Sequence, residues 1–344
     1  MVFFVDMERG TVVFKKIVFI LLATAFFVVP WAWAPARNWA PGLAVLAGIV
    51  FAVSWGNPFS KFTSKITSTM LGATIVGMGF GMDLIEVLRA GGNGFVYTLA
   101  GIAMGIGLGV LFGKMLKLPK NAMYLVSVGT SICGGSAIAA AAPVLKAKPH
   151  DIAMASATVF TLNAVALWVF PAVGHALGFT DVQFGYWAAL GIHDTSSVVG
   201  ASMSYGGEAL EVGTTVKLAR ALWIVPVTLF LSWFIADREE GEKRQFKLKV
   251  PWFIPWFIVA AAVVTWLPSL IPAAADAVAV TGGFIKDVSK FLMIVTLFLI
   301  GANLSREKLK ELGLRPVIQG VLLWGVLSVV WCVAIWCGWV NCIR

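Results

Sequence analysis

The sequence is poor in the residues on which soluble proteins and metalloproteins rely. Only 12% of the 344 residues are Asp, Glu, Lys or Arg, whereas soluble domains carry about 25% charged residues. The four cysteines form no CxxC pair, and His150, His175 and His193 stand far apart in the chain. Disulfide frameworks and zinc sites need suitably spaced Cys or His. The sequence therefore excludes a water-soluble globule and predicts no metal and no cofactor.

Apolar residues are abundant instead. They make up 59% of the chain, and a helix needs about twenty of them to cross the hydrocarbon layer. The sequence predicts an all-α membrane protein with about eleven transmembrane helices, in a single integral membrane domain over 1–344. Within it we expect a peripheral first helix (1–40), a first repeat (41–180) and a second repeat (181–344). The predicted segments are Ile17–Ala34, Pro41–Trp55, Ile66–Leu88, Gly94–Met115, Asn121–Leu145, Ile152–Leu177, Phe184–Met203, Val212–Ala236, Trp252–Ile271, Ala273–Gly301 and Val317–Val340.

The net charge of +9 lies mostly in short connections between apolar segments, as in cytoplasmic loops. We therefore expect no nucleic-acid partner, a cytoplasmic amino terminus, a polar cytoplasmic loop at 237–250 and a periplasmic carboxyl terminus. Lys146 and Lys148 conflict with this scheme if the segment 121–145 crosses the membrane. Either that segment re-enters, as 184–203 could also do, or both cross as broken helices. The charge count alone favours re-entry.

The first chemical motif is Gly129–Ala142, which reads GTSICGGSAIAAAA. Glycine-broken backbone is tolerated at membrane depth only where it is buried in protein or lines a watery cavity. A helix restarting here would offer free N–H groups and partial positive charge to an anion. The alternative is a packing groove in which Ser and Thr bond back to their own helix. Cys133 has no recognisable base beside it, so no nucleophile is predicted. The hydroxyl and glycine residues expected to bind are Thr130, Ser131, Gly134, Gly135 and Ser136.

A second interruption, Gly191–Ala201 (GIHDTSSVVGA), follows about sixty residues later, and paired interruptions point to a transporter binding site. His193 and Asp194 lie well inside this apolar segment, where ionisable groups are costly to bury and therefore functional candidates. We interpret them as acceptors of a coupling proton or cation, since histidine titrates near neutral pH. Thr195 and Ser196 extend the polar stretch. The alternative is that Asp194 only caps a half-helix.

Lys217 and Arg220 are three residues apart and share a helix face. Only sixteen residues, Ala221–Ala236, follow them before the polar loop, so at least Arg220 should lie within the membrane. Each would cost about 2.5–3.5 kcal/mol at the centre of a membrane helix. This cost is understandable if the pair faces a water-filled cavity or an anion. The alternative is that both side chains extend to the interface.

Small residues indicate close packing and repetition. Glycines recur every fourth residue through the fourth segment, which predicts a ridge where another helix approaches closely. Ala273–Gly301 is predicted either as a broken helix or as a loop followed by a shorter span. The glycines of the ridge are Gly101, Gly105, Gly109 and Gly113.

Two short matches suggest a duplicated unit. Gly81–Leu84 (GMDL) and Gly301–Leu304 (GANL) each end an apolar helix. Thr130-Ser131 with Gly135 and Thr195-Ser196 with Gly200 share another spacing. These matches occur in opposite orders along the chain, so one tandem duplication cannot explain both.

At GTSICGGSAIAAAAPVLKA, GIHDTSSVVGAS and TTVKLARALWIVPV the chain resembles the YeiH-like bacterial membrane proteins, which are labelled sulfate exporters. The resemblance extends from about Pro41 to Trp336. It implies a cytoplasmic-membrane carrier related to proton/sodium antiporters and bile-acid symporters, with inverted repeats and discontinuous helices crossing at the midplane. It thus favours crossing over re-entry. The residues carried over by the motif match are Thr130, Ser131, Cys133, Gly134, Gly135, Ser136, His193, Asp194, Thr195, Lys217 and Arg220.

Together the patterns predict a secondary active transporter, and not an enzyme, that moves a small anion across the bacterial inner membrane by alternating access. Sulfate or another sulfur-containing oxyanion fits two basic groups with several donors, and an ion-coupled organic anion fits nearly as well. An anion channel is the less favoured alternative, because no filter-like sequence occurs. The expected partners are the anion, a coupling proton or sodium ion and the lipid bilayer, and two copies could form a homodimer. The predicted substrate-binding residues are Thr130, Ser131, Cys133, Gly134, Gly135, Ser136, Thr195, Ser196, Lys217 and Arg220, and the predicted ion-coupling residues are His193 and Asp194.

Overall fold

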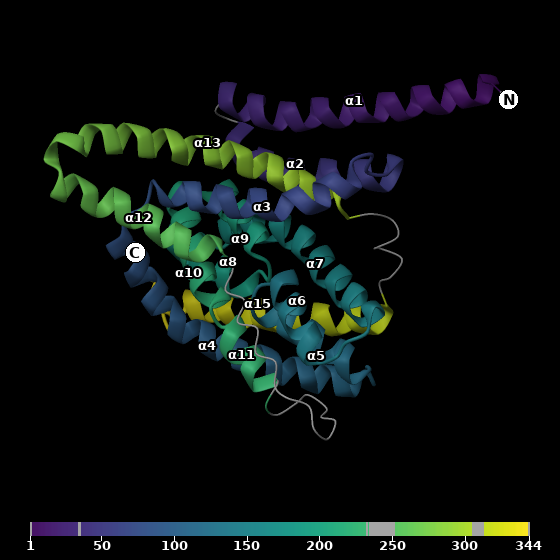
Figure 1. The fold of residues 1–344 in the computed structure, drawn as a ribbon. Coiled ribbons are helices and arrows are strands. Elements are labelled where there is room, and N and C mark those ends of the chain that lie inside the picture. Colours follow the sequence, from purple (N-terminus) through teal and green to yellow (C-terminus); the bar gives the residue numbers. More distant parts are fainter. Residues whose placement is uncertain (1, 34–35, 232, 234–251, 305–312, 343–344) are drawn as a thin grey trace, which may run out of the picture. The chain divides into compact units, whose positions relative to one another are not determined.

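The computed structural model is helical throughout the part of the chain that it describes (Figure 1). It describes residues 2–33, 36–231, 233, 252–304 and 313–342. Each of the eleven predicted segments overlaps at least one helix, so the all-α prediction is confirmed. The predicted polar loop at 237–250 lies outside the described residues.

The chain divides into two compact units, each drawn from both halves of the sequence. The first unit comprises 1–83 and 255–307. In it α13 packs against α2 and α3, and α1 packs against α13. Gly48 and Gly301 let the backbones of α2 and α13 approach closely, since a Cβ on either would collide with the other helix. The elements of this unit are α1 (Val2–Ala32), α2 (Ala36–Trp55), α3 (Ser60–Gly79), α12 (Phe253–Leu270), the short 3-10 helix η2 (Pro272–Ala274) and α13 (Ala275–Ala302).

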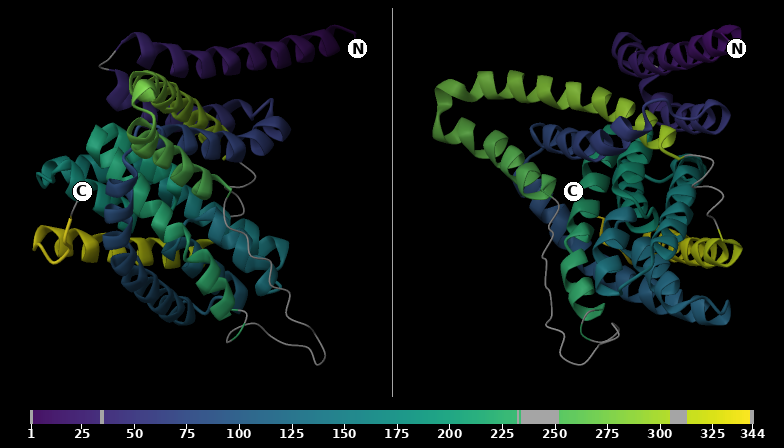
Figure 2. Two further views of the ribbon diagram at one scale, coloured as in Figure 1. Left: turned by 60° about the vertical axis from the view of Figure 1, so that its left-hand side comes forward. Right: turned by 45° about the vertical axis from the view of Figure 1, so that its right-hand side comes forward.

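The segment Ala273–Gly301 corrects both of its predicted alternatives. After η2 it forms the single unbroken helix α13, which runs back from the turn and diverges from α12 (Figure 2). Gly282 does not break the helix because its missing Cβ leaves room for the carbonyl of Phe80. At the far end, Asn303 accepts from the Thr63 hydroxyl at 2.6 Å and joins α13 to α3.

The second unit comprises 84–254 and 308–344. The glycine ridge of α4 packs on two helices: Gly105, Gly109 and Gly113 face α5, and Gly101 faces Trp331 of α15. The predicted role of the ridge in close packing is confirmed. The elements of this unit are α4 (Leu84–Met115), α5 (Lys120–Ser131), α6 (Gly135–Val144), α7 (Pro149–Ala176), α8 (Asp181–Gly191), α9 (Thr195–Tyr205), α10 (Gly207–Ala221), α11 (Ile224–Phe230) and α15 (Leu314–Trp336).

Both interrupted segments fold back on themselves. In the first, Gly129 of α5 lies against Ile138 of α6, so α6 returns alongside α5 (Figure 1). In the second, the ring of Phe184 in the first turn of α8 stacks on Tyr205 at the end of α9, with ring centroids 3.8 Å apart. The Tyr205 hydroxyl also donates to the carbonyl of Phe179, before α8, at 2.6 Å. The segments are helical hairpins, a geometry that agrees with the re-entrant alternative and differs from the discontinuous helices crossing at the midplane that the family resemblance implies. Their placement in a membrane stays a prediction.

Six described helices are long and apolar enough to cross a membrane. Since two of the eleven predicted segments are hairpins, at most nine would cross. The crossing of the remaining segments and the inverted repeats stay predictions. The six candidate spans are Val12–Ala32, Val87–Met115, His150–Ala176, Gly207–Phe230, Phe253–Leu270 and Leu314–Trp336.

Candidate functional site

The tip of the first hairpin is formed by Ile132, Cys133 and Gly134. Gly134 has φ +68° and ψ −127°, a conformation that is open to glycine and strained for other residues. Its N–H donates to the carbonyl of Gly129 at 2.9 Å, and its own carbonyl accepts the N–H of Ile138 at 3.1 Å. Glycine at this position therefore lets the chain reverse direction.

The tip of the second hairpin is formed by Ile192, His193 and Asp194. The Asp194 carboxylate accepts the backbone N–H groups of Ser196 and Ser197 at 3.1 and 3.3 Å and also the Ser196 hydroxyl. It thereby caps the first turn of α9, as Asp does at many helix starts. The structure thus shows Asp194 as a helix cap, and its coupling role stays a prediction. Asp194 is partly exposed.

The two tips meet. A Cβ placed on Gly134 would lie 3.3 Å from the Cβ of Asp194. Asn163 of α7 holds the second tip through its side-chain oxygen, which accepts the backbone N–H of His193 at 3.2 Å. The carbonyl ends of α5 and α8 and the N–H ends of α6 and α9 therefore gather at one place inside the second unit.

Lys217 of α10 joins the two tips. Its ammonium group donates to the carbonyl of Ile132 at 3.0 Å and to the carbonyl of Ile192 at 2.7 Å. The side chain is fully buried. Helix ends leave carbonyls without partners and carry partial negative charge, so a cation is favourable there.

Arg220, about one helical turn after Lys217, binds carbonyls at the same two helix ends. Its Nε and Nη2 donate to the carbonyl of Ser131, the Nε bond being 2.8 Å long. Its Nη1 donates to the carbonyls of Ala189 and Leu190 at 3.0 and 2.7 Å. Arg220 is also fully buried. Both cations thus lie inside the protein and bind carbonyls, and the alternative in which they extend to the interface does not occur.

The charges at the tips do not cancel. Each helix start contributes about half a positive elementary charge and each helix end about half a negative one, so the four ends balance. When Lys217 and Arg220 are protonated and Asp194 is ionised, these side chains add two positive charges and one negative charge. A net positive charge of about one unit therefore remains beside the tips, and such a field favours an anion.

The other predicted residues lie at different depths. Ser131 donates back to the carbonyl of Ser127 at 2.6 Å, as the packing alternative expected. Thr130 and His193 are fully buried, and neither the Thr130 hydroxyl nor either ring nitrogen of His193 has a partner within the described residues. Ser136 lies on the exposed side of α6, away from the buried set. The remaining predicted residues lie in the first tip or in the first turns of α6 and α9. They are Cys133 and Gly134, buried; Gly135, partly exposed; and Thr195 and Ser196, buried.

Sequence reasoning missed Asn163 and the carbonyls of Ile132 and Ile192. An amide in the otherwise apolar stretch from Val159 to Phe170 was a detectable signal, because polar side chains inside membrane segments are costly. The carbonyls carry no sequence signal. Their role becomes visible only when the hairpins bring them to Lys217.

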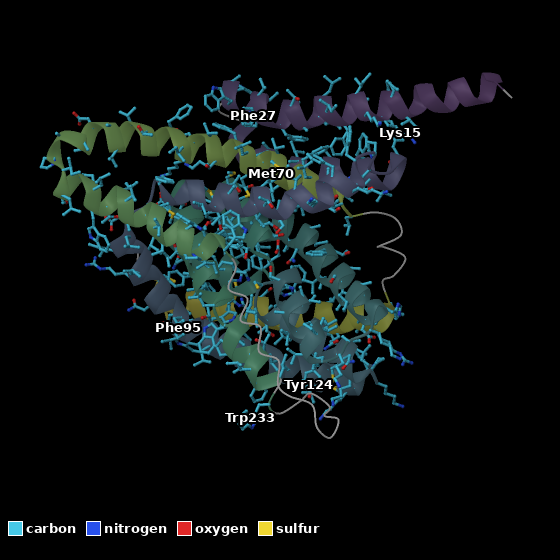
Figure 3. All side chains as sticks on the ribbon, viewed as in Figure 1. Lys15, Phe27, Met70, Phe95, Tyr124 and Trp233 are labelled. Atoms are coloured by element: carbon cyan, nitrogen blue, oxygen red, sulfur yellow. The ribbon has the colours of Figure 1, made fainter. Side chains whose placement is uncertain are left out.

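A kink separates α11 from α10, the helix that carries the cation pair. Trp223 lies at this kink, and its ring stacks on Phe95 of α4 with centroids 4.7 Å apart (Phe95 is labelled in Figure 3).

Within the described residues, no group of three or more His, Cys, Asp or Glu side chains comes together as metal ligands would. The chemistry that these residues can perform is hydrogen bonding and charge compensation.

The fold and the buried polar tips define the class of a multi-pass helical membrane protein. Within that class the chain belongs to the family described as Conserved hypothetical protein 698, whose model matches residues 16–320. It is 50% identical over 298 residues to a UPF0324 membrane protein of Bdellovibrio bacteriovorus, covering 87% of this chain and 89% of the relative.

Two further relatives have the same kind of name. A UPF0324 membrane protein of Geobacter sulfurreducens is 44% identical over 296 residues, covering 86% of this chain and 91% of the relative. One of Bacteroides thetaiotaomicron is 43% identical over 289 residues, covering 84% of each. No solved structure matches the chain significantly. These names state a membrane location and no substrate, so the resemblance to sulfate exporters stays a prediction.

Proposed function

We propose that the protein is a secondary transporter that moves a small anion across the bacterial cytoplasmic membrane by alternating access. The observation that supports this most directly is the meeting of two hairpin tips around two buried cations. Non-helical backbone at membrane depth is tolerated where it is covered by protein or lines a cavity. Transporters place substrate sites at such interrupted helices.

The geometry changes the role that we assign to the cations. Lys217 and Arg220 are committed to carbonyls of α5 and α8, so they attract the anion through the field rather than as its sole direct ligands. The direct donors in this proposal are the N–H groups at the start of α6 and the hydroxyls of Thr130 and Thr195. A sulfur-containing oxyanion such as sulfate suits several converging donors.

In the same proposal His193 and Asp194 take up a coupling proton or sodium ion. The imidazole is fully buried, and neither of its nitrogens has a partner among the residues that the structure describes. Asp194, next to it in sequence, is partly exposed. A group that changes charge at the tips would change the field that the anion meets. This links ion binding to anion binding without a catalytic step, and we propose no enzymatic role.

A matched pair of threonine variants tests the proposal. Thr130→Val removes a buried hydroxyl that has no partner in the described part of the chain, whereas Thr98→Val removes one that donates to the carbonyl of Phe95 at 2.8 Å. Both changes keep the side-chain shape. In proteoliposomes, Thr130→Val should weaken saturable counterflow of the transported anion about tenfold in apparent affinity, the effect of one lost hydrogen bond to a charged ligand. Thr98→Val should leave that affinity unchanged.

The anion is found first by a thermal-shift screen of the purified wild-type protein, because a ligand that binds the native state raises its apparent stability. Sulfate, sulfite, thiosulfate and small sulfonates form the panel, with chloride as the background anion. Absence of any saturable anion counterflow by the folded protein would contradict the proposed function. Flux that neither saturates nor shows counterflow would favour a channel.

A further inference from the structure

The two hairpins are built to one plan. The first has helices of 12 and 10 residues and the second has helices of 11 and 11, each pair joined by a three-residue tip. The tips, Ile132–Gly134 and Ile192–Asp194, begin sixty residues apart. A long helix follows each hairpin, α7 after the first and α10 with α11 after the second.

The hairpins also pack alike. Gly129 of α5 lies against Val159 of α7, thirty residues further along the chain. The carbonyl of Leu190 in α8 accepts from Arg220 in α10, also thirty residues further along. In the same way α4 packs on α5 and α15 packs on α8. Lys217 donates to Ile132 and Ile192, which hold the same first position in the two tips.

The helices of the first unit complete the correspondence. GMDL at Gly81–Leu84 ends α3 and leads into α4, and GANL at Gly301–Leu304 ends α13 and precedes α15. The first series is therefore α2, α3, α4, hairpin, α7. The second series is hairpin, α10 with α11, α12, α13, α15. The five members of the two series correspond one to one if the hairpin and the helix after it stand last in the first series and first in the second. The equivalent pieces therefore occur in opposite orders along the chain.

The hairpin tips correct the other sequence match. Thr130-Ser131 precedes the first tip, whereas Thr195-Ser196 follows the second. These pairs are not at equivalent positions. The structural equivalence joins the tips themselves, and a circular permutation of one repeat explains why they and the GMDL and GANL pieces occur in opposite orders.

We infer that the chain contains two inverted repeats, the second circularly permuted, so that the hairpins enter the membrane from opposite faces, α5–α6 from the cytoplasm and α8–α9 from outside. Because both hairpins return, α4, α6 and α10–α11 end on one side. That side collects the basic residues Lys114, Lys117, Lys120, Lys146 and Lys148 and, from the sequence of the following loop, Arg238, Lys243, Arg244, Lys247 and Lys249.

Acidic residues lie on the opposite side. Asp181 begins α8, and Glu208 and Glu211 lie in the first turns of α10. Cytoplasmic ends carry an excess of Lys and Arg, and acidic residues contribute little, so the basic residues set the orientation. The earlier conflict at Lys146 and Lys148 disappears. If the tips hold the substrate, as the proposed function has it, α5–α6 closes the cytoplasmic route and α8–α9 closes the external one.

Cysteine labelling tests this inference without any substrate, so its outcome is independent of transport. Four exposed positions are changed singly in the full chain: Lys114→Cys, Lys148→Cys, Leu177→Cys and Gly207→Cys. Gly207 accepts a side chain because a Cβ there meets nothing within 4 Å. Cys332, Cys337 and Cys342 are first replaced by Ala or Ser, and the buried Cys133 is kept. A membrane-impermeant maleimide is then applied to spheroplasts and to inside-out vesicles.

Leu177→Cys and Gly207→Cys should react in spheroplasts, and Lys114→Cys and Lys148→Cys in inside-out vesicles, each about tenfold faster than from the other side. Labelling after denaturation shows that each thiol is present. Crossing segments would place Lys148 opposite Lys114 and Leu177 opposite Gly207, and either result overturns the inference. Four positions that all react from one face, or pairs with reversed sides, overturn it as well.

Discussion

At the residue scale the molecule depends on two buried cations whose partners are backbone carbonyls. Taking an ammonium or guanidinium group out of water costs several kcal/mol even after relaxation. Here the cost is offset because the ends of α5 and α8 present the carbonyls of Ser131, Ile132 and Leu190, which would otherwise be unsatisfied away from water. The helix ends and the cations stabilise each other, so neither is dispensable.

Removing the guanidinium should therefore destabilise the fold. Arg220→Met leaves the carbonyls of Ser131, Ala189 and Leu190 without this donor, and losing one partner of a buried charged network costs about 3–5 kcal/mol. We expect the apparent melting temperature in detergent to fall by about 5–10 °C. The melting temperature should fall less in Arg220→Lys, and it should not change in Arg89→Met, which alters an exposed side chain. An unaltered melting temperature for Arg220→Met would contradict the carbonyl assignment.

Two variants of Asp194 separate its capping role from its proposed coupling role. Asn is as good a helix cap as Asp, so Asp194→Asn should keep the stability within about 0.5 kcal/mol, whereas Asp194→Ala should lose about 1 kcal/mol. Both remove the carboxylate charge. If Asp194 takes up the coupling ion, both variants alter the pH or sodium dependence of uptake. Wild-type dependence on both ions in the stable Asn variant would exclude the coupling role.

At the element scale the hairpins show what sequence reasoning can and cannot reach. Gly134 and Gly135 and the run from His193 predicted both breaks, because broken backbone and ionisable side chains at membrane depth are rare. The direction taken after each break depends on contacts between residues far apart in sequence, such as Phe184 with Tyr205. The charge count pointed to return, and the family resemblance pointed to crossing. Only the charge count agrees with the structure.

The first tip should be intolerant of any side chain. In Gly134→Ala the added Cβ would sit 3.3 Å from the Asp194 Cβ in a backbone conformation with φ +68°, for which we expect a loss of about 2–4 kcal/mol. Gly178 has φ +67° but open space around it, so Gly178→Ala should cost only about 1 kcal/mol. Thermal unfolding of both variants measures the difference. Equal melting temperatures would show that the tips do not touch.

At the scale of the whole molecule, composition predicted the helical membrane class, and apolar length predicted the helices. Neither composition nor apolar length could predict the division into two units, because each unit joins helices from distant parts of the chain. The same holds for the partners of Lys217 and Arg220. Their burial followed from the short apolar stretch after them, but a cation near an anion and a cation at a helix end look alike in sequence.

The side of the membrane on which the chain ends is a further consequence of the hairpins. A segment that re-enters does not change side, so eleven predicted segments become at most nine crossings. If all nine remaining segments cross, the number of crossings is odd, as eleven is. The carboxyl terminus is therefore expected outside whenever the amino terminus is cytoplasmic, and the two native cysteines after α15 report on it. Cys337 is exposed, and Cys342 is partly buried.

These two thiols should react at different rates from the same side. Burial raises the pKa of Cys342 to about 11, and the thiolate is the reactive form. Against an ordinary thiol pKa of about 8.5, its thiolate fraction near neutral pH is lower by roughly two orders of magnitude. In spheroplasts of Cys332→Ala, an impermeant maleimide should modify Cys337 first, with Cys342 gaining about tenfold in rate per pH unit below its pKa. Site-resolved mass spectrometry measures both rates. Modification of Cys337 only after permeabilisation would place the carboxyl terminus in the cytoplasm. That result would contradict nine crossings from a cytoplasmic amino terminus.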